Sequence, residues 1–130
     1  MNLLLDTCAV IFVAQSPTRL SAETRRMVID PSNVVFVCVA TVGELACLSA
    51  RKRISLPAHW KVWFRDRAST QGWNVMPLTL EIMEEAYSLP EPIHRDPVDR
   101  VLIAVARLEQ MTLVTTDRLI LDYPHVTAIA

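Results

Sequence analysis

Four carboxylates, Asp6, Glu44, Asp99 and Asp117, stand at predicted strand ends or helix starts, and together they could bind a metal ion. Four acids at one place repel one another, so either some of their pKa values rise or a cation holds them. A set of oxygen ligands without His or Cys suits a hard cation, Mg²⁺, with Mn²⁺ as a substitute. Such an ion keeps water ligands and supports the hydrolysis of a phosphodiester bond.

The residues around these acids predict an α/β domain with a mostly parallel sheet, because strands alternate with helices along the chain. Apolar runs at residues 2–5, 34–39 and 112–115 are typical of buried strands. Asp6 follows the first run directly, and Asp117 lies just past the third. Functional groups gather at the carboxyl ends of parallel strands, so we expect both acids at that edge. The other predicted elements are helices at 7–15, 21–29, 41–51, 58–71, 79–88 and 94–110, a turn or short helix at 118–122, and strands at 73–76 and 126–129.

Glu44 and Asp99 are predicted to lie in the first turns of helices that begin near the same edge. Thr41-Val-Gly-Glu44 matches a capping box, with Thr41 as the cap. Asp96 is predicted to cap the helix that carries Asp99. Taken singly, Asp96 and Asp99 are more simply helix caps, and Asp117 is more simply a turn residue. The metal site therefore depends on convergence of the acids.

The composition predicts a single domain over residues 1–130 with a substantial core, because 52% of the residues are hydrophobic and 21% are charged. No apolar run approaches the roughly 18 residues that span a bilayer, and the chain start has no basic region typical of a signal peptide. Cys8, Cys38 and Cys47 have no C-x-x-C spacing, which disfavours a disulfide scaffold or a zinc site. We interpret them as small buried thiols and expect a cytoplasmic location.

The basic residues give a weaker signal. The net charge of −1 does not by itself indicate nucleic-acid binding. Eleven of the thirteen basic residues are Arg, whose planar guanidinium suits phosphate contacts. Arg51-Lys52-Arg53 is the dense basic cluster of the sequence, and its simplest interpretation is a favourable charge group at a helix C-terminus. With two glycines, the chain has no Gly-rich phosphate loop.

These motifs resemble those of PIN domains, specifically VapC-type toxins of toxin–antitoxin pairs. The residues that carry the resemblance are Leu-Leu-Leu-Asp6-Thr, Glu44 in Thr-Val-Gly-Glu-Leu, His94-Arg-Asp-Pro-Val-Asp99-Arg-Val-Leu-Ile-Ala and Thr-Leu-Val-Thr-Thr-Asp117. The resemblance spans essentially the full chain, with Val98 as a departure where relatives commonly carry Phe. It implies a three-layer sandwich around a central, mostly parallel sheet. It also implies a Mg²⁺-dependent endoribonuclease that hydrolyses RNA.

The resemblance further implies a role for each acid. Asp6 and Asp99 would be the principal metal ligands, and Glu44 and Asp117 would complete the site directly or through water. Asp96 would act first as a cap and then as support behind the ligands.

Four more residues flank these acids. Thr7 and Thr115 could hydrogen-bond the acids or the scissile phosphate. Arg95 and Arg100 could contact RNA phosphates, although a surface ion pair is an equal alternative for Arg100. His94 is interpreted as a structural or hydrogen-bonding residue near the site.

Partners follow from the same resemblance: a homodimer, and a small VapB-like antitoxin that occludes the site. Trp60, Trp63 and Phe64 have the spacing of one helix face and are a candidate partner surface, or else part of the domain's own core. The alternative function is a PIN-like module that binds RNA or protein without cutting. Loss of one of the four acids would favour that alternative, and none is lost. Phosphotransfer through Asp6 is less favoured, because Cys8 stands where a second Asp is needed.

Overall fold

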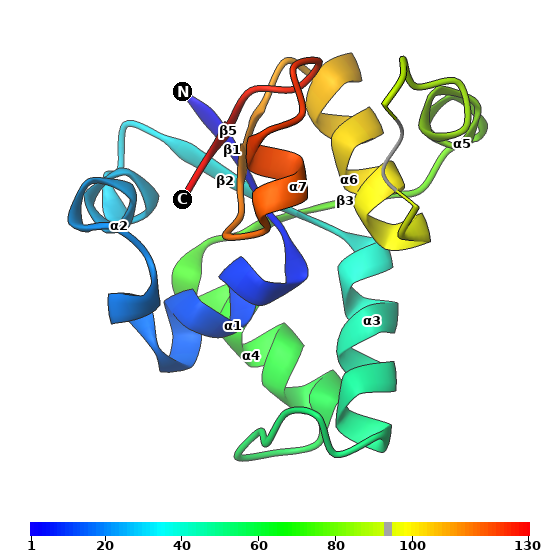
Figure 1. Cartoon of the computed structure of the whole chain (residues 1–130). Helices are drawn as coiled ribbons and strands as arrows, with labels where there is room; N and C mark the ends of the chain where they lie inside the picture. The colour runs from blue at the N-terminus through cyan, green and yellow to red at the C-terminus, as the bar shows by residue number, and fades with distance from the viewer. Residues whose placement is uncertain (93–94) are drawn as a thin grey trace.

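The computed structural model describes residues 1–92 and 95–130. Its strands are β1 (Asn2–Leu5), β2 (Val34–Cys38), β3 (Asn74–Met76), β4 (Thr112–Val114) and β5 (Ala128–Ile129). They form a five-stranded sheet in the order β3-β2-β1-β4-β5, and each pair of neighbouring strands runs parallel. The prediction of an α/β fold around a central parallel sheet is therefore confirmed (Figure 1).

The helices cover both faces of this sheet. They are α1 (Thr7–Gln15), α2 (Ala22–Ile29), α3 (Val39–Ala50), α4 (Trp60–Gln71), α5 (Leu80–Ala86), α6 (Pro97–Leu108) and α7 (Arg118–Leu121), with a short 3-10 helix η1 (Pro17–Arg19). None of the described helices is long and apolar enough to cross a bilayer.

Burial alternates along β1 and divides the core into two layers. Leu4 packs in a cluster formed largely with α5 and α6. Leu3 and Leu5 pack in a second cluster with residues of α1, α2 and α4. This follows from the two-residue period of a strand, which sends successive side chains to opposite faces. Figure 1 shows α5 and α6 together on one side of the strands, away from α1, α2 and α4.

The strand order reverses at β1, which lies between β2 and β4. In open parallel sheets this reversal opens a crevice at the carboxyl ends of the two strands, where functional groups are usually placed. The amide of Asp6 donates to the carbonyl of Val114 at 3.1 Å, so the ends of β1 and β4 are held side by side. α6 leads into β4 and packs against the sheet, which returns its N-terminus to the same edge.

The start of α6 agrees with its prediction. Asp96 caps the helix, its Oδ1 accepts from the amide of Asp99 at 3.0 Å, and Pro97 occupies the first turn. All six residues from Val101 to Ala106 are buried, as the unbroken apolar run indicates. The predicted helix also included His94, which lies outside the described residues.

The start of α3 differs from its prediction. The helix begins at Val39 directly after β2, with Cys38 as a cap that makes no side-chain hydrogen bond. Thr41 is therefore not the cap, and Glu44 lies in the second turn rather than the first. The physical reason is that Thr41 is fully buried and its hydroxyl accepts from Thr7 at 3.4 Å, a contact between distant segments that local motifs do not register.

Two further predictions are corrected. α4 begins at Trp60, two residues later than expected, because His59 caps it by accepting from the amide of Lys61 at 3.2 Å. The three cysteines are free, as expected, but only Cys38 is buried, and Cys8 and Cys47 are exposed.

Candidate active site

Asp6 forms the buried part of the site. It caps α1, its Oδ1 accepts from the amide of Ala9 at 2.7 Å, and the residue is 4% exposed. Burial raises the pKa of Asp6 to about 6, and the charges of Asp117 and Glu44 add to the rise, although hydrogen bonds from Thr115 and Ala9 oppose it. Removal from water disfavours the charged carboxylate of Asp6, so a bound cation would stabilise this charged form.

Asp117 enters the site from the adjacent strand. It caps α7, and its Oδ1 accepts from the amide of Leu119 at 2.9 Å. Its own amide donates to the hydroxyl oxygen of the buried Thr115 at 3.0 Å. Since Thr115 also hydrogen-bonds Asp6, one hydroxyl sets the geometry of both acids.

Asp99 reaches the site from the first turn of α6, where it is half-buried. Burial raises the pKa of Asp99 to about 8, and the negative charges of Asp96, Asp117, Asp6 and Glu44 raise it further in that order. The charge of Asp99 is therefore disfavoured at neutral pH unless a cation is nearby.

Glu44 completes the group although its helix begins earlier than predicted. It is half-buried on α3, and its charge raises the pKa of both Asp6 and Asp99. The structure thus brings the four predicted acids within electrostatic reach of one another at the switch point of the sheet.

Cys8 is a site residue that sequence reasoning missed. It reaches the surface beside the acids, yet desolvation raises the pKa of its thiol to about 11, and the charges of Asp6, Glu44, Asp99 and Asp117 contribute. The thiol is therefore protonated and unreactive at neutral pH. Its position directly after Asp6 and Thr7 was the available signal, but its residue type suggested only a small core side chain.

The donor chemistry fits a hard cation that keeps its waters. In residues 1–92 and 95–130, no three His, Cys, Asp or Glu side chains are grouped so that they could hold one ion. Mg²⁺ does not need such a cage, because it is usually bound through one or two carboxylates and several waters. Asp6 and Asp99 are the carboxylates whose charged forms a cation would stabilise most, since their pKa values are raised to about 6 and about 8.

The remaining predicted residues surround the acids unequally. Thr7 is buried and donates to Thr41. Arg95 is exposed next to the Asp96 cap. The guanidinium of Arg100 lies 5.1 Å from the centre of the Tyr87 ring, so a cation–π contact with α5 holds this side chain.

The predicted aromatic face of α4 lies mostly in the domain's own core. Trp63 and Phe64 are 4% and 6% exposed and pack with residues of β1 and β2. Only Trp60 is half-buried, and it lines an apolar groove of about 710 Å³ with Val39 and Val75. A surface role is therefore open to Trp60 alone among these three residues.

The comparisons with known proteins agree with this architecture. The chain is 28% identical to Ribonuclease VapC22 of Mycobacterium tuberculosis over 124 aligned residues. The alignment covers 95% of this chain and 93% of that protein. The structure of VapBC2 from Rickettsia felis, bound to a DNA fragment from its promoter, matches with a TM-score of 0.73 at 13% identity, over 98% of this chain and 97% of that one.

A second solved structure has the same fold. It is VapC20 of Mycobacterium tuberculosis, described as a Sarcin-Ricin loop cleaving toxin, with a TM-score of 0.61, 20% identity and coverage of 96% and 98%. The family model of the PIN domain matches residues 3–126, which include all four clustered acids. With that match and this fold, the chain belongs to the PIN domain family.

Proposed function

We propose that this protein is a Mg²⁺-dependent endoribonuclease that hydrolyses RNA phosphodiester bonds and is the toxic component of a toxin–antitoxin pair. The observation that carries the proposal is the electrostatic coupling of Asp6, Glu44, Asp99 and Asp117 at the switch point of a PIN domain. The names of two similar proteins, a ribonuclease and a Sarcin-Ricin loop cleaving toxin, support the reaction class.

When bound, Mg²⁺ would polarise a phosphate oxygen and lower the pKa of a bound water. Asp6 and Asp99 are the residues that would hold it, and Glu44 and Asp117 would add negative charge through bound water. The Ala9 amide and the Thr115 hydroxyl fix the orientation of the Asp6 carboxylate, so little rearrangement is needed when the charge is neutralised.

The Asp96 cap has a positioning role in the same site. Its carboxylate accepts from the amide of Asp99 and fixes the first turn of α6, from which Asp99 reaches the other acids. The negative charge of Asp96 also disfavours the charged form of Asp99, which makes a cation there more favourable.

The proposed partners are a VapB-like antitoxin and a second copy of the chain. A toxin–antitoxin complex from Klebsiella pneumoniae contains a chain with this fold, which matches 98% of this chain with a TM-score of 0.64. We infer that an antitoxin occludes the acids until it is removed.

A catalytically silent PIN-like module is the second candidate. One observation favours it: among the described residues, no three His, Cys, Asp or Glu side chains are grouped so that they could hold one ion. The two candidates differ in metal binding, so a metal titration separates them.

The deciding experiment is a Mn²⁺ titration by calorimetry of the parent and of Asp99→Asn. Binding by the parent that the variant loses supports the nuclease, whereas no binding by the parent favours the silent module.

Expression without antitoxin tests the toxin separately. Growth arrest is expected, and harmless accumulation of folded protein would oppose the toxin assignment while leaving the nuclease intact.

A further inference from the structure

We propose that the basic turn, defined as Arg51, Lys52 and Arg53, anchors the phosphates of an RNA strand that passes over the four acids. The inference rests on the proposed function, because a nuclease site provides the reason for a nearby polyanion. The basic turn follows the last residue of α3, and all three of its side chains are exposed.

The backbone of the basic turn is held in an unusual conformation for its sequence. The amide of Lys52 donates to the carbonyl of Ser49 at 3.1 Å, and the amide of Arg53 donates to the carbonyl of Leu48 at 2.9 Å. These two bonds form a Schellman motif, in which the residue after the cap is left-handed and is usually glycine. Lys52 occupies that place with φ 55°, where a side chain is disfavoured.

The same chain uses glycine for the equivalent turn after α4. Gly72 has φ 71°, and the amide of Trp73 donates to the carbonyl of Ala68 at 2.9 Å. A third such turn, after α6, has the uncharged Gln110 at φ 54°. Lysine at Lys52 therefore opposes local backbone preference, as glutamine does at Gln110, so the strain alone does not require a charge at this place.

The basic turn has a defined position relative to the acids. Arg51 is the C-cap of α3, seven residues after Glu44, so the two residues lie about two helical turns apart and within about 20° of the same face. The rise along the helix places them about 10.5 Å from each other. A strand whose phosphate sits at the acids can therefore reach the basic turn a few nucleotides away.

The segment that follows the basic turn is attached to the rest of the fold. Gln15, at the end of α1, donates from Nε2 to the carbonyl of Ser55 at 3.3 Å. Ile54 and Leu56 pack against the core cluster that contains Trp63. α1 begins directly after Asp6 and α3 carries Glu44, so the bond from Gln15 to Ser55 links the far ends of two helices that lead away from the acids.

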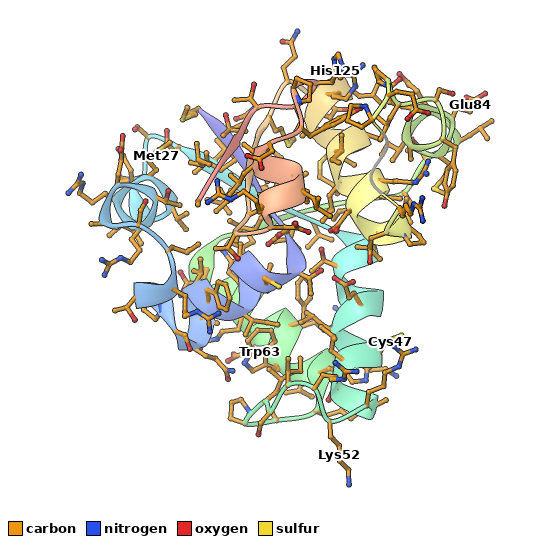
Figure 2. The ribbon with its side chains drawn as sticks, in the orientation of Figure 1. Met27, Cys47, Lys52, Trp63, Glu84 and His125 are labelled. Atoms are coloured by element: carbon orange, nitrogen blue, oxygen red, sulfur yellow. The ribbon has the colours of Figure 1, made fainter. Side chains whose placement is uncertain are left out.

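The charges of the basic turn are available to a ligand. None of the ion pairs formed within the described ranges involves Arg51, Lys52 or Arg53. Figure 2 shows Lys52 at the end of the molecule opposite His125, pointing away from the rest of the structure. With a net charge of −1 and a cluster of acids at the site, RNA binding requires local positive charge that offsets repulsion of the phosphates.

The test separates the charge of Lys52 from its backbone conformation. Lys52→Gln removes the charge and keeps the left-handed residue, whereas Lys52→Gly removes both. We would measure binding of a fluorescein-labelled single-stranded RNA of mixed sequence in EDTA, as a function of salt, together with the thermal unfolding temperature. EDTA prevents metal-dependent cleavage, so binding is read independently of catalysis.

Both variants should bind the RNA more weakly, and the slope of log K against log salt should become shallower by about 0.7 for the lost phosphate contact. Lys52→Gly should also raise the unfolding temperature, because glycine relieves the left-handed residue. A more stable protein that binds RNA less well excludes misfolding as the cause.

Two controls match these changes elsewhere. Gln110→Gly relieves the corresponding residue after α6 and should raise the unfolding temperature without changing RNA binding. Arg26→Gln removes one exposed positive charge from α2 and should leave the salt slope unchanged.

Unchanged affinity and slope in both Lys52 variants would overturn the proposal, as would a parent that does not bind the RNA. An acidic polypeptide serves as a second probe in the same assay. If the Lys52 variants bind RNA as the parent does but lose binding to this polypeptide, the proposal is overturned and a protein partner is indicated instead. Failure of the proposed function looks different. In that case the parent binds RNA through Lys52, yet it neither cleaves RNA nor binds Mn²⁺.

Discussion

Thr115 hydrogen-bonds the carboxylate of Asp6 and thereby joins the ends of β4 and β1 where the strand order reverses. The same hydroxyl oxygen accepts from the amide of Asp117 at 3.0 Å, and Thr115 itself is fully buried. A single side chain therefore positions an acid from each of the two central strands, which makes it the sharpest test of how the site is built.

Thr115→Val should weaken Mn²⁺ binding. Loss of the hydroxyl removes a donor to Asp6, so the pKa of Asp6 rises further and protons compete better with the metal. Loss of the hydrogen bond from the Asp117 amide should lower the free energy of unfolding by about 0.5–1.5 kcal/mol. Calorimetric titrations and urea denaturation measure the two effects, with Thr115→Ser as the control that keeps the hydroxyl. Equal Mn²⁺ affinity in the valine variant and the parent would contradict this account.

Asp99→Asn should abolish RNA cleavage and yet stabilise the metal-free protein in alkaline solution. Burial and neighbouring acids raise the pKa of Asp99 to about 8, so its charged form is disfavoured in the folded state. Asparagine has a similar shape and no charge. In EDTA its unfolding temperature should exceed that of the parent at a pH well above 8, and the difference should shrink at a pH below 3.8.

The matched control for this variant is Asp66→Asn. Asp66 is an exposed carboxylate on α4 that pairs with Arg67 at 3.5 Å. This substitution should change neither cleavage nor the pH dependence of unfolding. A destabilised Asp99→Asn protein at alkaline pH would mean that Asp99 has a favourable partner that outweighs the repulsion.

The parts of the site that follow from local chemistry could be predicted from the sequence. Asp6 and Asp117 directly follow apolar strands, and Asp96 precedes Pro97 in a recognisable helix start. For Glu44 the sequence predicts the correct edge but the wrong helix start, because β2 passes straight into α3 without a turn residue that would mark where the helix begins.

What could not be predicted depends on contacts between distant segments. The Thr7–Thr41 contact joins α1 to α3 across 34 residues, and no local motif encodes it. The residue type of Cys8 predicts a place in the core, but the acids whose charges act on it come from four different elements. The type of a residue suggests whether its side chain is buried. The charged groups that lie near it can be identified only once the fold is known.

The free energy of unfolding of the metal-free protein should fall as the pH rises from about 4 to about 8. The pKa values of Asp6 and Asp99 rise from 3.8 to about 6 and about 8 on folding. In this interval the folded state binds more protons than the unfolded state, so the slope of the unfolding free energy against pH is negative. The contribution is complete below a pH of about 4 and is lost as the pH passes through the folded pKa of each acid.

Mg²⁺ should reverse this trend, because a cation favours the charged carboxylates. Urea denaturation at a series of pH values, with EDTA or with Mg²⁺, measures both slopes. Parallel curves in the two conditions would show that no cation binds near Asp6 and Asp99. An upward slope in EDTA alone would mean that their pKa values are not raised in the folded protein.

Trp63→Ala should destabilise the protein far more than Trp60→Ala, although both residues lie on α4. Trp63 is 4% exposed inside the core cluster of β1 and β2, so its truncation leaves a cavity and should cost about 3–5 kcal/mol. Trp60 is half-buried at the rim of the α3–α4 groove, and its loss should cost about 1 kcal/mol. Urea denaturation followed by circular dichroism avoids reliance on tryptophan fluorescence. The reverse order of the two costs would place Trp60 in the core and leave Trp63 as the surface that a partner could use.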